Sequence, residues 1–582
     1  MKGRSSLLTV TVGALLVAAF IPAVGSDVAS GQARDARQVP VPADPLPVIT
    51  GASVGIPQTW SNVAPGQVSG TSGGRTTGDT WFNTWADDGN IYATSDDSQG
   101  FLGTCKVTGG NVVVNELNGN DPSELRSPFV NCMTSYGVGQ QRGIYHDGRT
   151  WKNIGIIAVD GTLYLAVARQ VDGAGGYPVG FQPSDDVSII KSTDHGRTWT
   201  NSFGTTNDPN GAAPPPDRSG PGAAAMFPGT TFATPAFIQY GRDDNAASTA
   251  DGGDRYVFAI SNDGFAYDGS HYILGRVPRS KIGDLHAADW RFYTGPAGGN
   301  GMNPANWSGN ASKATHILAA PHQLSQASVQ YIQALHSYVL ASSYFPFDAS
   351  WPSEGAGQHT IWAFYEAPHP WGPWTRFFSE PATECYFGCS TSVSLGWYDP
   401  AFVSKFITMH GLGNVVLTAA DFGAPKRPND FLYKLHAFPV TLTSTTRRVI
   451  DDASAVPVGT SNWPYNSSDY PGYYDDSVHY SNTAGSAVSY TFVGTSIAWV
   501  GGENTDHGYA EVSIDGGPPT SVDTYAPHQE EQQILFEKDG LSDGRHTITI
   551  TVTSQKDAAS TGIYQDVDAL IVGQAGRAGA DQ

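Results

Sequence analysis

The feature that most constrains the fold of this chain is a unit of two apolar strands joined by a tight turn, which recurs over about the first 440 residues. Its clearest copy runs from Ile154–Val159 through the turn Asp160-Gly161 to Leu163–Ala168. An Asp-Gly pair favours a two-residue hairpin, because both residues tolerate the positive φ angles that such a turn needs. Short strands separated by turns of this kind, without long amphipathic helices, predict an all-β chain.

The unit occurs five times, and most copies continue with further strands and end near a tryptophan. Repeats of this length predict a five-bladed β-propeller, in which the first strand of each blade lines a central channel. A β-sandwich would need shorter, more even spacing and no recurring tryptophan. The five copies span 79–97, 154–199, 233–292, 327–375 and 398–438.

The segment Ser192–Trp199, with the sequence STDHGRTW, marks the corner of the second blade. It resembles the Asp-box of sialidases and other β-propeller proteins. Asp194 is expected to bind backbone N–H groups of the turn, and Gly196 to supply a positive φ angle. The resemblance implies a structural role for Asp194 and His195 on the rim, and it does not imply that the chain binds sialic acid.

Two segments precede the first blade. Residues 1–25 combine a basic start, the apolar run Leu7–Phe20 and small residues, which is the pattern of a secretory signal peptide. Residues 26–75 are rich in Pro, Gly and Ser without clear periodicity, and they are expected to form a linker. The protein is therefore expected to be secreted and to have no membrane segment after cleavage of the signal.

Composition narrows the possible partners. The four cysteines of an exported chain are candidates for disulfides, and the nearest pairs are Cys105 with Cys132 and Cys385 with Cys389, although three connectivities are possible. A formal net charge of −22 without basic clusters argues against nucleic acid as a partner. Because no zinc, P-loop or dinucleotide pattern occurs, no metal or cofactor is expected. We expect a monomer that binds a polysaccharide or oligosaccharide.

A second domain is expected after the propeller, which would occupy 76–445. Residues 447–575 contain strands of alternating polarity, such as Thr547–Thr553. This region resembles the galactose-binding-like β-sandwich, a jelly-roll fold that is appended to many secreted bacterial glycosidases. The resemblance implies a carbohydrate-binding module.

Catalytic candidates follow from the blade pattern. Cleavage of a glycosidic bond needs two carboxyl groups on either side of the bond, one as acid and one as base or nucleophile. Asp79 and Asp399 both stand where an inner strand begins, and they form the predicted pair. Glu366, at the end of a strand, is a third candidate, and Asp96 and Asp97 are further ones.

Substrate-binding candidates are polar or aromatic residues at the same mouth of the channel. The segment 142–152 also concentrates cations and a histidine, which would suit a polysaccharide lyase that acts on a uronate through His146 or Tyr145. A solvated loop is the alternative for this segment. The binding candidates are Trp81, Asn83, Arg142, His146, Trp151, Lys152, Asn153, Arg169, Gln326, Trp397 and Tyr398.

Several short sequence segments resemble those of a group of secreted five-bladed glycosidases that includes endo-D-arabinanases. Among them are Trp151–Gly155, Tyr365–Thr375 and Trp397–Lys405. The likeness spans about 75–440. It implies a glycoside hydrolase that uses carboxylates, with an Asp of the first blade fitting Asp79 or Asp96 and Asp97. A polysaccharide lyase and a non-catalytic glycan-binding protein are the alternatives.

Overall fold

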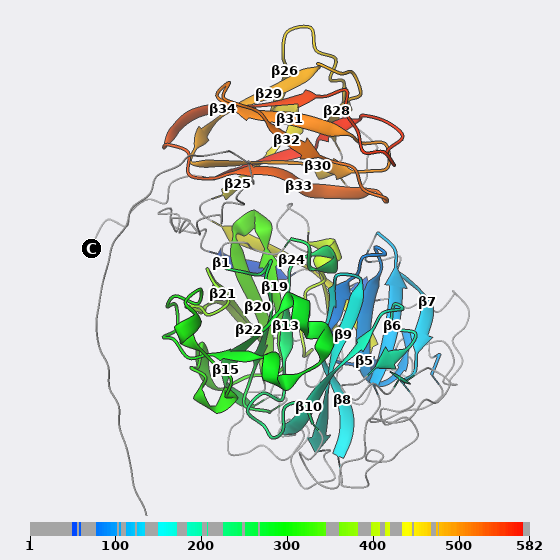
Figure 1. Cartoon of the computed structure of the whole chain (residues 1–582), viewed down its shortest axis with the longest axis vertical. Helices are drawn as coiled ribbons and strands as arrows, with labels where there is room; N and C mark the ends of the chain where they lie inside the picture. Colours follow the sequence, from blue (N-terminus) through cyan, green and yellow to red (C-terminus); the bar gives the residue numbers. More distant parts are fainter. Residues whose placement is uncertain are drawn as a thin grey trace, which may run out of the picture. The chain divides into compact units, whose positions relative to one another are not determined.

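A computed structural model gives the architecture of the chain. It describes residues 49–573 except 55–57, 60–76, 102–103, 106–111, 121, 123–124, 134–148, 172–182, 201–205, 208–224, 247–250, 266–267, 345–359, 382–396, 408–413, 420–433, 445–446, 467–472 and 475–476. These residues form strands and short 3-10 helices, so the all-β prediction is confirmed (Figure 1). Among them, no helix is long and apolar enough to cross a membrane.

The first two blades are separate sheets. The first contains β3 (Thr77–Asp79), β4 (Asn83–Trp85), β5 (Ile91–Gly100), β6 (Val112–Asn118) and β7 (Arg126–Asn131). The second contains β8 (Arg149–Val159), β9 (Thr162–Val171), β10 (Ser184–Ser192), β11 (Trp199–Thr200) and β12 (Thr206–Asn207). The predicted turn between β8 and β9 is confirmed, because Asp160 and Gly161 have φ angles of 51° and 72°.

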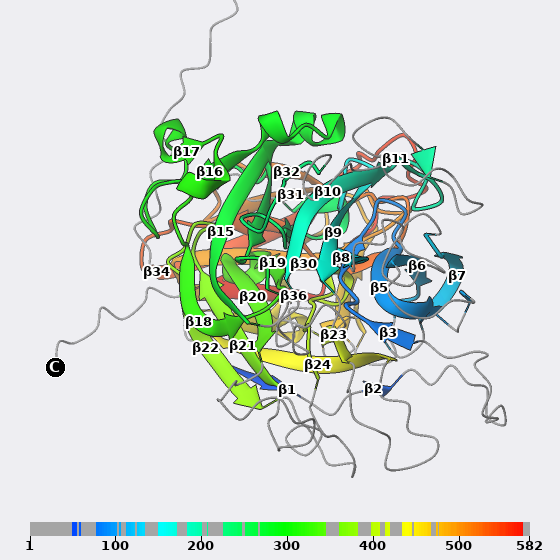
Figure 2. The ribbon, with the colours of Figure 1, turned by 90° about the horizontal axis from the view of Figure 1, so that it is seen from below.

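The third and fourth blades share one sheet, because their inner strands β13 and β19 pair in parallel. The third contains β13 (Ala236–Gln239), β14 (Tyr256–Ser261), β15 (Gly269–Pro278), β16 (Arg291–Tyr293) and β17 (Trp307–Ser308), and β18 (Leu318–Leu324) also pairs with β15. The fourth contains β19 (Ser328–Ile332), β20 (Ser337–Tyr344), β21 (Ile361–Ala367) and β22 (Thr375–Pro381). Figure 2 shows the sheets arranged in a ring.

The fifth blade closes the ring, and its strands differ from two of the predictions. It contains β23 (Asn414–Ala419) and β24 (Lys434–Ser444), and β1 (Ile49–Val54) and β2 (Gln58–Thr59) pair with β24. Part of the predicted linker 26–75 is therefore a component of the propeller. The segment Tyr398–Val403, predicted as the inner strand, has no regular strand pairing.

Hydrogen bonds between inner strands hold neighbouring blades together. The Thr84 hydroxyl donates to Gln239 Oε1 at 2.9 Å, and the Gln330 amide donates to the Gln239 carbonyl at 3.1 Å. The Ser404 hydroxyl then donates to Gln330 Oε1 at 2.6 Å. Because these buried groups satisfy one another, they connect the neighbouring blades at little cost in unpaired polar atoms of their own.

Apolar clusters fill the space between blades. One joins Tyr92 and Val114 of the first blade to Ile156 and Leu165 of the second. Another joins Ile157 of the second blade to residues of the third, such as Phe237 and Val257. Alternate residues of each strand therefore enter two different interfaces, as expected for sheets that are covered on both faces.

The Asp-box has the predicted structural role. The Thr198 backbone N–H donates to Asp194 Oδ1 at 2.8 Å, and the Thr198 hydroxyl donates to Asp194 Oδ2 at 2.6 Å. Gly196 has a φ angle of 78°, and the Trp199 indole donates to the Gly196 carbonyl at 3.0 Å. The motif thus builds the turn between β10 and β11.

One of the nearest cysteine pairs is confirmed, since Cys105 and Cys132 form a disulfide that ties the β5–β6 loop to the residue after β7. Cys385 and Cys389 lie outside the described residues.

The sandwich consists of three small sheets around one apolar core, which contains Trp463, Phe492, Trp499, Ile550 and Leu570. Alternate residues of the sheet strands point into this core, as the polarity pattern predicts. The strands are β25 (Arg447–Asp451), β26 (Val456–Pro457), β27 (Tyr465–Asn466), β28 (Val478–Ser481), β29 (Ala487–Gly494), β30 (Ser496–Glu503), β31 (Tyr509–Ile514), β32 (Thr520–Asp523), β33 (Glu530–Lys538), β34 (Gly544–Val552), β35 (Gln565–Val567) and β36 (Ala569–Gly573).

Candidate active site

Residues of the first and fifth blades meet next to the start of the inner strand β4. Asp79, at the end of β3, is 6% exposed, and its Oδ2 accepts a hydrogen bond of 2.7 Å from the Tyr398 hydroxyl. Asp79 also stands directly opposite Asp96 of β5 in the antiparallel pair. Side chains of directly opposite residues lie on one face of a sheet, so the two carboxyl groups are neighbours.

Asp96 is paired with a cation from the second blade. Lys152 Nζ lies 2.5 Å from Asp96 Oδ1, and the two side chains are 12% and 2% exposed. A carboxylate buried to this degree needs a partner for its charge, and the ammonium group supplies it. Lys152, predicted as a substrate-binding residue, is thus an ion-pair partner of a carboxylate at the mouth.

Asp399 follows Tyr398 directly and is fully buried. Its backbone has a φ angle of 52°, and its N–H donates to the Ser343 hydroxyl at 3.0 Å. A left-handed conformation is unfavourable for a residue other than glycine, so it persists only where the surroundings impose it. The structure therefore brings both members of the predicted pair, Asp79 and Asp399, to the segment around Tyr398.

Glu366 is placed elsewhere. It lies on β21, the third strand of the fourth blade, and its carboxylate accepts a hydrogen bond of 2.8 Å from the backbone N–H of Ile49 on β1. Burial raises the pKa of Glu366, and the bond from Ile49 acts in the opposite direction. Glu366 therefore joins the fourth blade to the N-terminal strand and does not stand at an inner-strand start with Asp79.

The aromatic binding candidates are buried in the structure. Trp81, Trp151 and Trp397 are only 1–2% exposed. Trp81 packs among Ile91 and Leu117, and its indole donates to the Gly78 carbonyl at 3.0 Å. Burial of such large apolar side chains stabilises the cores within and between blades, and their contact with a sugar ring stays a prediction.

The polar binding candidates divide into two groups. The Asn153 amide donates to the Thr80 carbonyl at 2.7 Å and to the Thr94 hydroxyl at 2.8 Å, so it joins the second blade to the first. Asn83 and Gln326 are 8% and 3% exposed, and their side-chain oxygens have no hydrogen-bond partner.

Arg169 is completely buried, and its guanidinium lies over the Trp151 ring, 5.1 Å from the centroid. The two residues are opposite each other in the β8–β9 pair. A guanidinium over an aromatic face is stabilised by the ring quadrupole. Arg142 and His146, on which the lyase alternative depends, lie outside the described residues, as does Tyr145.

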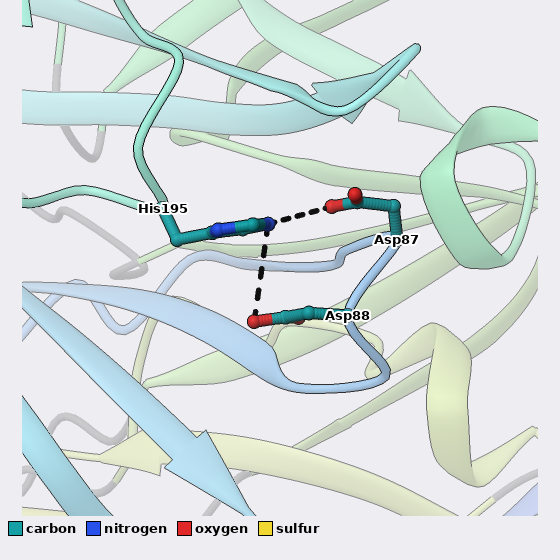
Figure 3. Close-up of side chains that lie close together, drawn as sticks. All are labelled: Asp87, Asp88 and His195. Carbon is teal, nitrogen blue, oxygen red and sulfur yellow. Dashed lines mark hydrogen bonds and ion pairs between the residues drawn. The ribbon is translucent and has the colours of Figure 1, made fainter. Parts of the chain in front are cut away.

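The opposite end of the first blade carries the cluster in Figure 3. His195 Nε2 lies 2.8 Å from Asp87 Oδ1 and 3.9 Å from Asp88 Oδ2. The His195 ring also stacks on Tyr92, with the centroids 5.9 Å apart. Because the Asp-box residue His195 contacts the β4–β5 turn of the neighbouring blade, the cluster joins two blades. This agrees with the structural role predicted for His195.

Sequence reasoning named Asp96 and Lys152 separately and did not pair them. It also missed Asp268 and His322, whose carboxylate and imidazole lie 3.0 Å apart. An acidic residue ahead of β15 and a histidine within β18 give no local signal, because the two meet only through the pairing of those strands.

Comparisons with known proteins match parts of the chain. The model of the family "Carbohydrate esterase 2 N-terminal" matches residues 473–568, within the sandwich. The A type blood N-acetyl-alpha-D-galactosamine deacetylase of Flavonifractor plautii is 42% identical over 105 residues, which are 18% of this chain and 13% of that protein. The A type blood alpha-D-galactosamine galactosaminidase of the same organism is 31% identical over 130 residues, 21% of this chain and 12% of that protein.

Solved structures give only distant likenesses. An exo-beta-1,3-galactanase from Phanerochaete chrysosporium has a TM-score of 0.28 and 9% identity, covering 91% of this chain and all of that chain. A xylan beta-1,4-xylosidase from Bacillus halodurans has a TM-score of 0.34 and 9% identity, covering 87% of this chain and 100% of that chain. Scores this low carry no information on activity.

Proposed function

We propose that this protein is a carbohydrate-active hydrolase that cleaves glycosidic bonds at the mouth of the propeller channel. The observation that carries the proposal is the juxtaposition of Asp79 and Asp96, because two neighbouring carboxyl groups with different partners are what this reaction needs. The names of the partial relatives, a deacetylase and a galactosaminidase, support a sugar substrate.

The two carboxyl groups take different roles in this proposal. The ammonium of Lys152 stabilises Asp96 in its ionised form, which a nucleophile or base must have. Asp79, held by the Tyr398 hydroxyl, donates a proton to the leaving oxygen.

Product analysis on a panel of plant and bacterial polysaccharides tests the proposal. Hydrolysis gives new reducing ends, whose anomeric configuration NMR can follow. A product with ultraviolet absorbance would identify an unsaturated uronate and hence a lyase, whereas release of acetate would identify a deacetylase. If glycans are bound but none of these products appears, the protein is a glycan-binding protein and the proposal is wrong.

We propose that the sandwich retains the enzyme on its substrate. Support comes from the family model that matches 473–568, whose description names a carbohydrate esterase domain. Binding of the full protein to insoluble polysaccharide, compared with that of a protein ending before residue 447, measures this contribution. Equal retention of the two proteins would contradict it.

Loss of the Lys152 ammonium is expected to impair turnover. Lys152→Met leaves the buried Asp96 carboxylate without its cation, so kcat should fall by about 10²-fold. Lys152→Arg should restore most of the rate, because the charge returns. Lys191→Met is the matched control, since Lys191 Nζ donates to the Gly283 carbonyl at 2.6 Å, away from the mouth. An unchanged kcat in Lys152→Met with normal folding would exclude this role.

A further inference from the structure

A second pair of titratable side chains, Asp268 and His322, lies on the third blade. The loop that contains Asp268 leads from β14 to β15, and Asn262 in this loop accepts a hydrogen bond of 2.7 Å from the Thr234 hydroxyl. Thr234 lies just before the inner strand β13, so this loop is at the inner-strand starts. His322 lies on β18, which pairs with the beginning of β15.

Hydrogen bonds connect this region to the candidate carboxylates. Ser325 directly follows β18, and its hydroxyl accepts a hydrogen bond of 3.2 Å from the Ser343 backbone N–H. The Ser343 hydroxyl in turn accepts the N–H of Asp399. Buried hydrogen bonds through Ser343 therefore link the residue after β18 to Asp399.

In the Asp268–His322 pair, the buried carboxylate of Asp268 holds the exposed imidazole of His322. The Asp268 side chain is 7% exposed and the His322 side chain is 70% exposed, with Nδ1 lying 3.0 Å from Asp268 Oδ1. Burial raises the pKa of Asp268, and the contact with His322 lowers it. Because Nδ1 is engaged by the carboxylate, the ring orientation is fixed and Nε2 is left for another partner.

Other titratable side chains lie on the same strands or next to the pair. His271 and His316 stack with ring centroids 3.6 Å apart, and Asp263 Oδ2 lies 3.9 Å from His271 Nδ1. Arg376 of the fourth blade donates to the side chain of Gln323, which is adjacent to His322. The three imidazoles thus form a polar rim along β15 and β18 of the third blade.

We propose that His322 binds a hydroxyl group of the carbohydrate substrate and that Asp268 positions its ring. This inference rests on the proposed function and adds a binding contact on the third blade to the carboxylates of the first. Nε2 of an imidazole can accept a hydrogen bond from a sugar hydroxyl or, when protonated, donate one to it. The strand pairing that fixes both residues makes the contact rigid before the ligand arrives.

The test is a comparison of KM and kcat for soluble oligosaccharides of arabinose, galactose, xylose and N-acetylgalactosamine. His322→Ala should raise KM by about tenfold and change kcat by less than about twofold, which corresponds to one lost hydrogen bond to bound substrate. Asp268→Asn keeps an oxygen that can accept from Nδ1, so its KM should rise less. His316→Ala removes an exposed imidazole of the same rim and should leave KM unchanged.

The possible outcomes separate this inference from the proposed function. If the wild type hydrolyses an oligosaccharide and His322→Ala has a normal KM, the inference is wrong and the proposed function stands. If the wild type hydrolyses none, the proposed function fails, and calorimetric titration of the same oligosaccharides into wild type and His322→Ala decides the binding contact alone. A loss of kcat equal to the rise in KM would show that His322 acts beyond binding and overturn the inference as stated.

Discussion

Asp79→Asn is expected to lower the rate of glycoside hydrolysis by a factor of about 10³ while the protein stays folded. The amide oxygen of asparagine can still accept the Tyr398 hydroxyl, so the hydrogen bond seen at 2.7 Å is retained. The substitution removes only the acidic proton that the leaving oxygen needs. Initial rates on the substrate from the product panel, with thermal unfolding as the check on folding, measure the effect.

Asp96→Asn should cause a loss of similar size, because the amide cannot act as the nucleophile or base. Asp87→Asn is the matched control, since Asp87 is an exposed aspartate that contacts His195 at the blade junction.

Asp399→Asn tests which aspartate acts together with Asp79. A larger loss in Asp399→Asn than in Asp96→Asn would restore the pair Asp79 and Asp399 that the sequence predicts. Near-normal rates in Asp79→Asn would remove the proposed site altogether.

Asp568→Asn should stabilise the sandwich in alkaline solution. Asp568 is completely buried, its Oδ1 accepts the Tyr474 N–H at 2.6 Å, and its Oδ2 has no hydrogen-bond partner. Burial, followed by the nearby Asp566 and Asp452 charges, raises the pKa of Asp568 to about 8. The folded protein therefore keeps a proton that the unfolded chain releases near pH 4.

The direction of the pH dependence follows from this difference in bound protons between the folded and the unfolded protein. The unfolded chain binds fewer protons than the folded one between about pH 4 and pH 8, so the contribution of Asp568 to stability falls with rising pH across this window. Each pKa unit is worth about 1.4 kcal/mol, which gives an upper limit of about 6 kcal/mol at pH 8. Asn has no charge to bury, so the variant should gain several degrees in Tm at pH 8 and little at pH 4.

Thermal unfolding of the full protein at both pH values measures the gain. Asp566→Asn is the contrasting variant on the same segment, because Asp566 is well partnered: it accepts hydrogen bonds from Gly502 N–H at 2.6 Å and from the Tyr473 hydroxyl at 3.1 Å, and it contacts His507. That variant should lose stability. A lower Tm for Asp568→Asn at pH 8 would show that its carboxylate is charged and compensated in the folded state.

Much of the propeller could be predicted because its signals are local. The turn at Asp160 and Gly161 depends on two residues that tolerate positive φ, and the Asp-box depends on contacts within eight residues. The N-terminal segment shows the limit of such signals. β1 and β2 lack strong periodicity of their own and become strands because β24 offers them an edge to pair with.

The site was predictable only in outline. The period of the blades predicts that Asp79 and Asp399 stand where inner strands begin. The structure places Asp79 at the end of β3 and Asp399 in a segment without regular strand pairing. The burial of Trp81 and Trp397 was not predictable, because an aromatic residue ahead of a strand can face either the channel or the core between blades. The sequence pattern is the same in both cases, and only the packing of the neighbouring blade distinguishes them.

The sequence by itself thus determined the all-β class and the repeated blades, since these depend on residue type and spacing along one strand. The tertiary structure alone decided that Asp96 is the neighbour of Asp79 and that Lys152 neutralises it. Those two contacts depend on the register between β3 and β5 and on the approach of β8 from the next blade. Register is fixed by the sum of many side-chain contacts on both faces of a sheet, and no single residue encodes it.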